Sequence, residues 1–147
     1  MTMDMRPSDT APRTGPGTVL IIEDESNILE ALTFILSRAG WDVRGHGKGD
    51  SALAEVARIG PDVLVLDVML PGQSGFDILR ALRAEPETRD LPVVMLTAKG
   101  QTHDRDHAMG LGANAFLTKP FSNDELLAVI TDLAPAPTDR PAAAGQG

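Results

Sequence analysis

The stretch Val63-Leu-Val-Leu-Asp67-Val68 decides the fold of this chain. Every residue in it except Asp67 is apolar, so no polar face alternates with an apolar one. A strand that helices cover on both faces reads in this way, whereas a strand with one face in water alternates. We therefore predict a central strand of a parallel sheet that carries a carboxylate at its carboxyl end.

Four further segments read as strands. Three are apolar and lead into polar residues: 18–22 before Glu23 and Asp24, 93–96 before Thr97, and 115–118 before Lys119 and Pro120. The fourth, residues 41–44, is shorter and more polar, which is typical of a sheet edge. As neighbouring parallel strands, these segments would gather three carboxylates, a hydroxyl and an ammonium group at one edge of the sheet.

Apolar residues at helical spacing fill the segments between the strands. The pattern predicts helices over about residues 26–39, 50–59, 76–83, 103–109 and 122–133, of which 103–109 is the most weakly patterned. We expect Asp50 to cap the second helix and Ser122 with Glu125 to form a capping box at the last. The core-facing residues are expected to be Ile28, Leu32, Ile35 and Ala39; Leu53, Val56 and Ala57; Phe76, Leu79 and Leu82; and Leu126, Ile130 and Leu133.

Strict alternation of strands and helices indicates right-handed strand-helix-strand units. We predict an α/β fold with a doubly wound parallel sheet of five strands, in the order 2-1-3-4-5, and five helices. In such a sheet the ligand lies outside the carboxyl ends of the strands where the strand order reverses, here between strands 1 and 3. Glu23, Asp24 and Asp67 follow or end these two strands.

Composition favours one soluble domain. The chain has 147 residues, of which 42% are hydrophobic, and its lack of cysteine excludes disulfides, thiolate nucleophiles and cysteine-ligated zinc. Residues 1–17 and 134–147 are rich in Pro, Gly or Ala and read as disordered tails around a domain at 18–133. No segment has the pattern of a signal peptide or a membrane span, so we expect a cytoplasmic protein without membrane insertion.

The charge distribution argues against direct binding of nucleic acid. Acidic and basic residues balance in each tail, so the formal charge of −8 belongs to residues 18–133. Contacts to nucleic-acid phosphates need clustered Lys and Arg. An acidic domain suits a site that attracts a cation.

The polar residues at the strand ends form a set of motifs. These are Glu23-Asp24, the stretch Val65-Leu-Asp-Val-Met-Leu-Pro-Gly-Gln-Ser-Gly75, Thr97-Ala98, and Lys119-Pro120-Phe121. In order and spacing they resemble the receiver domain of two-component response regulators across residues 18–133. The resemblance implies the flavodoxin-like receiver fold, and because no output module fits in the last fourteen residues, we expect the stand-alone type.

The resemblance also implies a role for each site residue. Asp67 would accept a phosphoryl group from a sensor histidine kinase or a phosphotransfer protein, as a phosphoacceptor with intrinsic autophosphotransfer and autodephosphorylation and not as an enzyme. Glu23, Asp24, Asp67 and the backbone carbonyl of Met69 would hold Mg²⁺. Thr97 and Lys119 would bind phosphoryl oxygens. The family also has a cis peptide bond at the position of Lys119-Pro120, and we expect one here.

A switch follows from the same resemblance. Thr97 would move toward the phosphoryl group, and Phe116 would rotate into the space it leaves, which would change a surface that contacts an unidentified downstream protein. Family members that dimerise through the fourth helix, fifth strand and fifth helix carry an acidic pair before that aromatic residue and an arginine in the last helix. Here the pair is Asn114-Ala115 and residues 122–133 contain no basic residue. We therefore expect a monomer, or a dimer without those salt bridges.

Three other functions compete with this hypothesis. A phosphohydrolase like the haloacid dehalogenases also uses a strand-end Asp with Mg²⁺, but it has a second acid two residues later, where this chain has Met69. An interaction module that does not accept phosphate would not need the complete set of acid, hydroxyl and lysine. The chain could also be a receiver fragment of a larger regulator, because Ala134-Pro-Ala-Pro-Thr138 resembles an interdomain linker.

Three more patterns are interpreted as structural. His103 and His107 have the spacing of metal ligands on a helix, but no third ligand is placed, so we interpret them as solvated. The stretch 110–115 matches a loose dinucleotide fingerprint in the wrong context, after a helix and before a strand. The stretch 45–49 lacks the full spacing of a phosphate loop and reads as a flexible turn.

Overall fold

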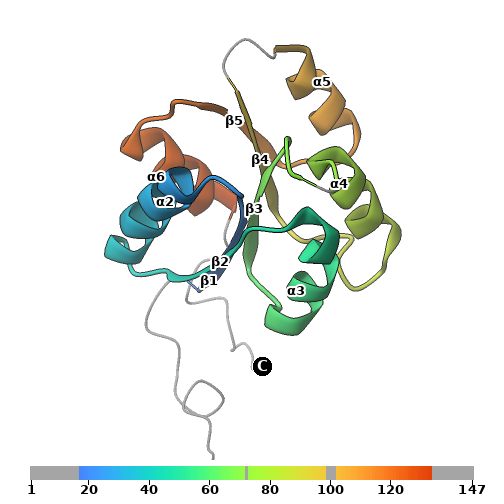
Figure 1. Ribbon diagram of the computed structural model, residues 1–147, viewed down its shortest axis with the longest axis horizontal. Coiled ribbons are helices and arrows are strands. Elements are labelled where there is room, and N and C mark those ends of the chain that lie inside the picture. The colour runs from blue at the N-terminus through green and yellow to red at the C-terminus, as the bar shows by residue number, and fades with distance from the viewer. Residues whose placement is uncertain (1–16, 72, 99–101, 134–147) are drawn as a thin grey trace, which may run out of the picture.

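The computed structural model describes residues 17–71, 73–98 and 102–133 (Figure 1). The predicted tails lie outside these residues except for Gly17, whose carbonyl oxygen accepts a hydrogen bond from the N–H of Asp42 at 2.9 Å. The described part is one α/β unit built on a single sheet. No helix in it is long and apolar enough to cross a membrane.

The sheet has five parallel strands in the order β2-β1-β3-β4-β5, which confirms the predicted topology. The strands are β1 (Thr18–Ile22), β2 (Asp42–His46), β3 (Val63–Asp67), β4 (Val93–Ala98) and β5 (Ala115–Lys119). All five residues of β3 are buried, as its continuous apolar run predicted. The strand order reverses between β1 and β3, where Ile22 is the register partner of Leu66.

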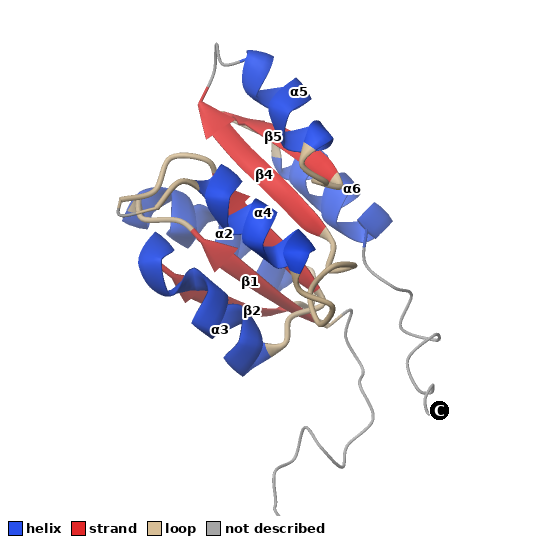
Figure 2. Cartoon of the chain, turned by 90° about the vertical axis from the view of Figure 1, so that its right-hand side faces the viewer, coloured by secondary structure: helices blue, strands red, loops and turns tan. Residues whose placement is uncertain are grey.

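Helices cover both faces of the sheet. They are α2 (Ser26–Arg38), α3 (Ala52–Ile59), α4 (Gly75–Ala84), α5 (Thr102–Gly110) and α6 (Asn123–Leu133), with a short 3-10 turn, η1 (Gly49–Ser51), before α3. Figure 2 shows α3, α4 and α5 in front of the sheet and α2 and α6 behind it. Side chains alternate along each central strand, so Leu20 and Leu64 pack toward α3 and α4, while Val19 and Val65 pack toward α2 and α6.

The helix faces agree with the sequence pattern in part. In α6, Leu126 and Ile130 are buried as predicted, and the capping box forms: the Glu125 N–H donates to Ser122 Oγ at 3.0 Å and the Ser122 N–H donates to Glu125 Oε1 at 3.1 Å. In α4, Leu79 and Leu82 are buried as predicted, Phe76 is half-buried, and Ile78 joins them.

In α2 the prediction for Ala39 is wrong. The helix ends at Arg38, so Ala39 is an exposed cap residue, and Leu36 is buried one helical turn after Leu32.

The core face of α3 agrees with the prediction only in part, and a 3-10 turn precedes the helix. The turn at Gly49–Ser51 makes Ser51 the N-cap residue in place of Asp50. Val56 is buried as predicted and Ala52 is buried as well, whereas Leu53 is 38% exposed. Ala57 is exposed as well.

Trp41 precedes β2 and is buried in the core between the sheet and the α2–α6 layer. The predicted edge strand therefore begins one residue later than expected, at Asp42, and extends to His46. Gly45 and His46 belong to that strand and not to a flexible turn, which corrects the interpretation of 45–49.

Candidate functional site

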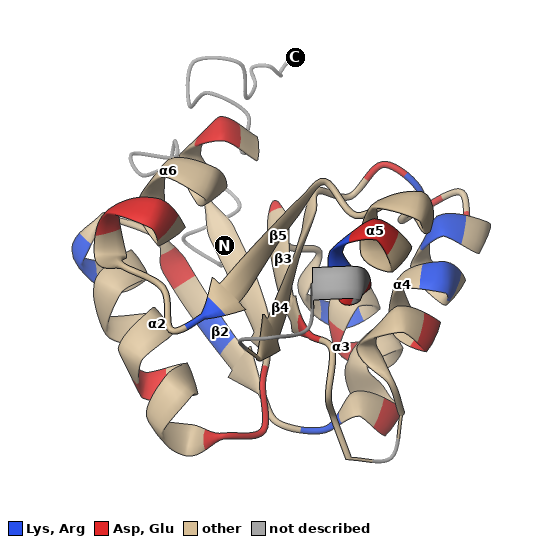
Figure 3. Cartoon of the chain, turned by 90° about the horizontal axis from the view of Figure 1, so that it is seen from above, with Lys and Arg blue, Asp and Glu red and all other residues tan. Residues whose placement is uncertain are grey.

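The acidic residues predicted to gather at the sheet edge do so. Glu23 and Asp24 follow β1, and Asp67 is the last residue of the neighbouring strand β3. One carboxylate oxygen from each of the three lies within 4.8 Å of the others. Asp and Glu residues also occur along helices of both layers (Figure 3), so the negative charge is not confined to this cluster.

Burial makes two of these carboxylates costly to ionise. Glu23 and Asp67 are 1% and 3% exposed, whereas Asp24 is exposed. Desolvation raises the pKa of Glu23 from its usual 4.5 to about 7, although its side chain accepts a hydrogen bond from the Glu25 N–H at 3.1 Å. Desolvation also raises the pKa of Asp67, against the opposing effect of the nearby ammonium group of Lys119.

Lys119 supplies the positive charge at the centre of the cluster. Its Nζ lies 3.1 Å from Glu23 Oε1, 3.2 Å from Glu25 Oε1 and 3.4 Å from Asp67 Oδ2. Burial alone lowers the pKa of this ammonium group, but Glu23, Asp67 and Glu25 outweigh that effect and raise it. The Lys119-Pro120 peptide bond is cis, which confirms the expectation for this position.

The donor set fits a divalent cation. Among the described residues, Glu23 Oε1 is a buried side-chain oxygen without a hydrogen-bond partner, because its contact with Lys119 is an ion pair without hydrogen-bond geometry. It lies beside two further carboxylates, and Mg²⁺ prefers hard oxygen ligands of this kind. Asp24, Asp67, Met69 and Lys119 are among the residues that line a pocket of about 490 Å³ at this edge.

Met69 lies directly beside the cluster. Its N–H donates a hydrogen bond to Asp67 Oδ1 at 3.3 Å, and its side chain is 73% exposed. This contact fixes one oxygen of Asp67 and leaves the other, Oδ2, facing Lys119. The role of the Met69 carbonyl as a metal ligand stays a prediction.

Thr97 lies on the next strand. It follows Leu96, the register partner of Asp67, and is only 1% exposed. Its Oγ1 donates a hydrogen bond to Asp104 Oδ2 on α5 at 3.2 Å. Phe116, on β5, is half-buried and packs against the core on the α3–α4 side of the sheet.

The contacts of two residues near the acidic cluster were not predicted from the sequence. Glu25 forms an ion pair with Lys119, and the acidic run that it extends, Glu23-Asp24-Glu25, was the signal that could have found it. Asp104 contacts Thr97 across seven residues, and no pattern in the sequence indicated that pairing.

Gly75 fixes the backbone that carries Asp67. Its N–H donates to the carbonyl oxygen of Val68 at 2.9 Å, where α4 begins. A Cβ at this position would overlap the backbone carbonyl group of Asp67. The stretch after β3 therefore needs glycine here for steric reasons, because the start of α4 packs directly on the end of β3.

The patterns interpreted as structural lie away from the cluster or serve packing. His107 is exposed and its ring meets Phe76 edge-on with centroids 4.5 Å apart, while the side chain of His103 lies outside the described residues. Gly110 is the last residue of α5, and Gly112 lies in the turn that leads to β5. The Asn114 side chain accepts hydrogen bonds from the Val93 N–H at 2.8 Å and from Arg83 Nη2 at 2.9 Å.

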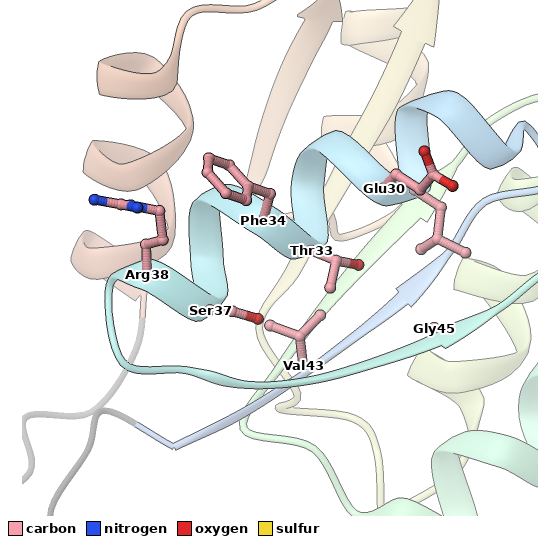
Figure 4. Close-up of a pocket in the computed structure, with 8 residues that line it drawn as sticks. Glu30, Thr33, Phe34, Ser37, Arg38, Val43 and Gly45 are labelled. Atoms are coloured by element: carbon pink, nitrogen blue, oxygen red, sulfur yellow. The ribbon is translucent and has the colours of Figure 1, made fainter.

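A second hollow lies on another side of the molecule, between α2 and β2 (Figure 4). It has a volume of about 600 Å³, and its walls include Thr33, Phe34, Arg38 and Val43. The guanidinium of Arg38 lies 5.4 Å from the centre of the Phe34 ring. This groove holds none of the residues of the acidic cluster.

Comparison with known proteins agrees with the geometry. The family model of the response regulator receiver domain matches residues 19–131. The sensory transduction protein RegX3 of Mycolicibacterium smegmatis is 43% identical over 113 residues, which are 77% of this chain and 48% of that protein. The phosphate regulon transcriptional regulatory protein PhoB of Escherichia coli is 43% identical over 112 residues, or 76% of this chain and 49% of PhoB.

The solved structures show the same relationship. A protein from Chloroflexus aurantiacus J-10-fl, described as a response regulator, has a TM-score of 0.78 at 36% identity and matches over 80% of this chain and 97% of its own. The chain spans about half the length of the curated relatives it matches. With 113 of its residues covered by the family model and relatives at this identity, the chain belongs to the family of response regulator receiver domains.

Proposed function

We propose that this receiver domain accepts a phosphoryl group on Asp67 and signals through protein contacts. The observation that carries the proposal is the setting of the Asp67 carboxylate. It is buried at the end of the central strand, one oxygen is held by the Met69 N–H, and the other faces the Lys119 ammonium group at 3.4 Å. A carboxylate placed in this way can act as a nucleophile only where a positive charge offsets the negative charge of the incoming phosphoryl group.

The proposed donor is a phosphohistidine of a sensor histidine kinase or a phosphotransfer protein. An oxygen of Asp67 attacks phosphorus, the bond from phosphorus to the imidazole nitrogen breaks, and the histidine leaves with the electron pair of that bond. Lys119 neutralises one phosphoryl oxygen as a point charge, and the Thr97 hydroxyl donates a hydrogen bond to another.

Glu23, Asp24 and Asp67 would hold Mg²⁺, with the Met69 carbonyl as a further ligand. When bound, the cation supplies charge neutralisation for the phosphoryl oxygens and for the clustered carboxylates. The fit rests on the three carboxylates within 4.8 Å and on the buried Glu23 oxygen that has no hydrogen-bond partner.

The output is a changed surface and not a chemical product, so we class the domain as a phosphoacceptor and not as an enzyme. RegX3 and PhoB are named as sensory transduction and transcriptional regulatory proteins, and this chain matches about half of each. The proposal for this chain covers the receiver activity alone: phosphorylation by a kinase or phosphotransfer protein, and altered contact with a downstream protein.

The test is intact-mass spectrometry after incubation with Mg²⁺ and a small acyl-phosphate donor. The wild-type chain should gain the mass of one phosphoryl group, and the Asp67→Asn variant should not. A wild-type chain that binds Mg²⁺ but gains no mass would support a phosphate-independent interaction module. Steady release of phosphate from external phosphate esters would support a phosphohydrolase.

A further inference from the structure

The side chain of Thr97 has a partner on α5 that the proposed phosphoryl chemistry does not use. Its hydroxyl donates to Asp104 Oδ2 at 3.2 Å, from the end of β4 to the first turn of α5. Thr97 is 1% exposed, so its hydroxyl is cut off from bulk water, and Asp104 is only partly exposed. A buried hydroxyl that loses such a partner must find another one.

A threonine hydroxyl carries a single hydrogen that it can donate. In the structure this hydrogen serves Asp104. A phosphoryl oxygen on Asp67 would need the same hydrogen, so the two acceptors compete for it. The Asp104 carboxylate and the phosphoryl group are both anionic, and like charges repel each other strongly where there is little water. Binding of Thr97 to one acceptor is therefore accompanied by repulsion of the other.

Helix α5 buries little of its described side chains. Among its described side chains, Ala108 is the buried one, and His107 contacts Phe76 at the surface. Asp104 provides the link to Thr97 at the end of the helix nearest the site. The helix has little apolar surface that could pack against the rest of the domain. The loss of one polar contact therefore has a large effect on its local stability.

We propose that Asp104 is the positioning residue that holds the Thr97 hydroxyl while Asp67 is unmodified, and that competition for this hydroxyl transmits phosphorylation to α5. The inference rests on the proposed function of Asp67. Phosphorylation removes the hydrogen bond to Asp104 and so weakens the attachment of the first turn of α5. Asp104 acts on the phosphoryl site through its hydrogen bond to Thr97.

The first experiment needs no phosphoryl group. Amide hydrogen exchange is measured in the unmodified full chain and in its Asp104→Ala, Asp104→Asn and Thr97→Val variants. Asp104→Ala and Thr97→Val should each speed exchange in α5 by roughly three- to tenfold, the value of one hydrogen bond to a charged group that is partly solvated. Asp104→Asn keeps an acceptor oxygen and should stay close to wild type. Asp106→Ala removes the same charge from an exposed position on the same helix and serves as the matched control.

The second experiment measures calorimetric affinity for beryllofluoride, a mimic of the phosphoryl group, in the presence of Mg²⁺. Asp104→Ala should bind it roughly three- to tenfold more tightly than wild type, because no hydrogen bond has to be broken first. The same substitution in the Thr97→Val background should have a smaller effect, limited to the negative charge that it removes. A purely structural role for Asp104 would not produce this dependence on Thr97.

The outcomes separate the two ideas. If the wild-type chain binds beryllofluoride and the Asp104→Ala variant binds it equally or more weakly, the proposed competition for the Thr97 hydroxyl is wrong. The proposed function of Asp67 is then unaffected. Unchanged α5 exchange in both Asp104→Ala and Thr97→Val overturns the anchoring role. Wild-type chain that binds Mg²⁺ but not beryllofluoride overturns the proposed function and the competition together.

Discussion

Replacing Lys119 with methionine should destabilise the metal-free domain in a way that depends on pH. The ammonium group lies within 3.4 Å of three carboxylates, and two of these, Glu23 and Asp67, are buried. Removing one partner of a buried ion pair lowers stability by about 3–5 kcal/mol. Because Glu23 can escape part of this penalty by taking up a proton, we expect a loss of about 2–4 kcal/mol near pH 8.

The sign of the pH dependence follows from the raised pKa of Glu23. A carboxyl group whose folded-state pKa lies above its unfolded value favours the folded state when protonated, so that stability is lost as the pH rises from 4.5 through about 7. Without the ammonium group the pKa of Glu23 and that of Asp67 rise further. The deficit of the variant should therefore be largest near pH 8 and smaller near pH 6, and saturating Mg²⁺ should also reduce it.

Urea denaturation of wild type and Lys119→Met, at both pH values and with and without Mg²⁺, measures the effect. Lys48→Met removes the same charge from an exposed position beside η1 and should change stability by less than about 0.5 kcal/mol. Equal stability of Lys119→Met and wild type near pH 8 without metal would contradict a stabilising role of the Lys119 ion pairs. A deficit that is the same at both pH values would contradict the pH dependence expected from the raised pKa of Glu23.

The remaining predictions concern the metal and the packing. Mg²⁺ affinity, measured by calorimetry, should fall about tenfold between pH 8 and pH 6, because a proton competes for Glu23 with a pKa of about 7; a pH-independent affinity would exclude Glu23 as a ligand. Gly75→Ala should lower the free energy of unfolding by more than about 2 kcal/mol, since its Cβ overlaps the carbonyl group of Asp67, whereas Gly110→Ala, with open space around it, should be tolerated. Leu36→Ala should lower it by about 2–5 kcal/mol and Phe34→Ala, at a side chain that is 62% exposed, by less than about 1 kcal/mol; similar losses would contradict the described core.

The sheet could be predicted because its signal is local. A continuous apolar run such as 63–66 is typical of a strand that is buried on both faces, and the order of strands then follows from the handedness of their connections. Helix phase was harder to predict. In α3, Ala52 is buried and Leu53 is exposed, and the sequence did not predict the 3-10 turn at Gly49–Ser51 that precedes this helix.

The residues of the acidic cluster could be placed at one edge because strand ends of a parallel sheet meet there. Their pairings could not be read in the same way. Glu25 reaches Lys119 across 94 residues, and Asp104 reaches Thr97, through side-chain conformations that packing decides.

Asn114 illustrates a different limit of the sequence. From the sequence it counted only as the absence of an acidic residue at a dimer surface. In the structure its side-chain oxygen accepts hydrogen bonds from the Val93 N–H and from Arg83, so it fastens β4 and α4 to the turn before β5. That role does not decide the oligomeric state, and the expectation of a monomer or a differently built dimer stays a prediction.

The central claim is that Asp67 is the residue that receives the phosphoryl group. The most direct measurement is peptide mass spectrometry after phosphorylation with Mg²⁺ and an acyl-phosphate donor, followed by borohydride reduction, which converts an aspartyl phosphate to homoserine. Homoserine is expected at position 67 and unmodified aspartate at position 24. Modification at Asp24, at Glu23 or at His46, or a phosphorylated chain whose Asp67 is unchanged, would contradict it.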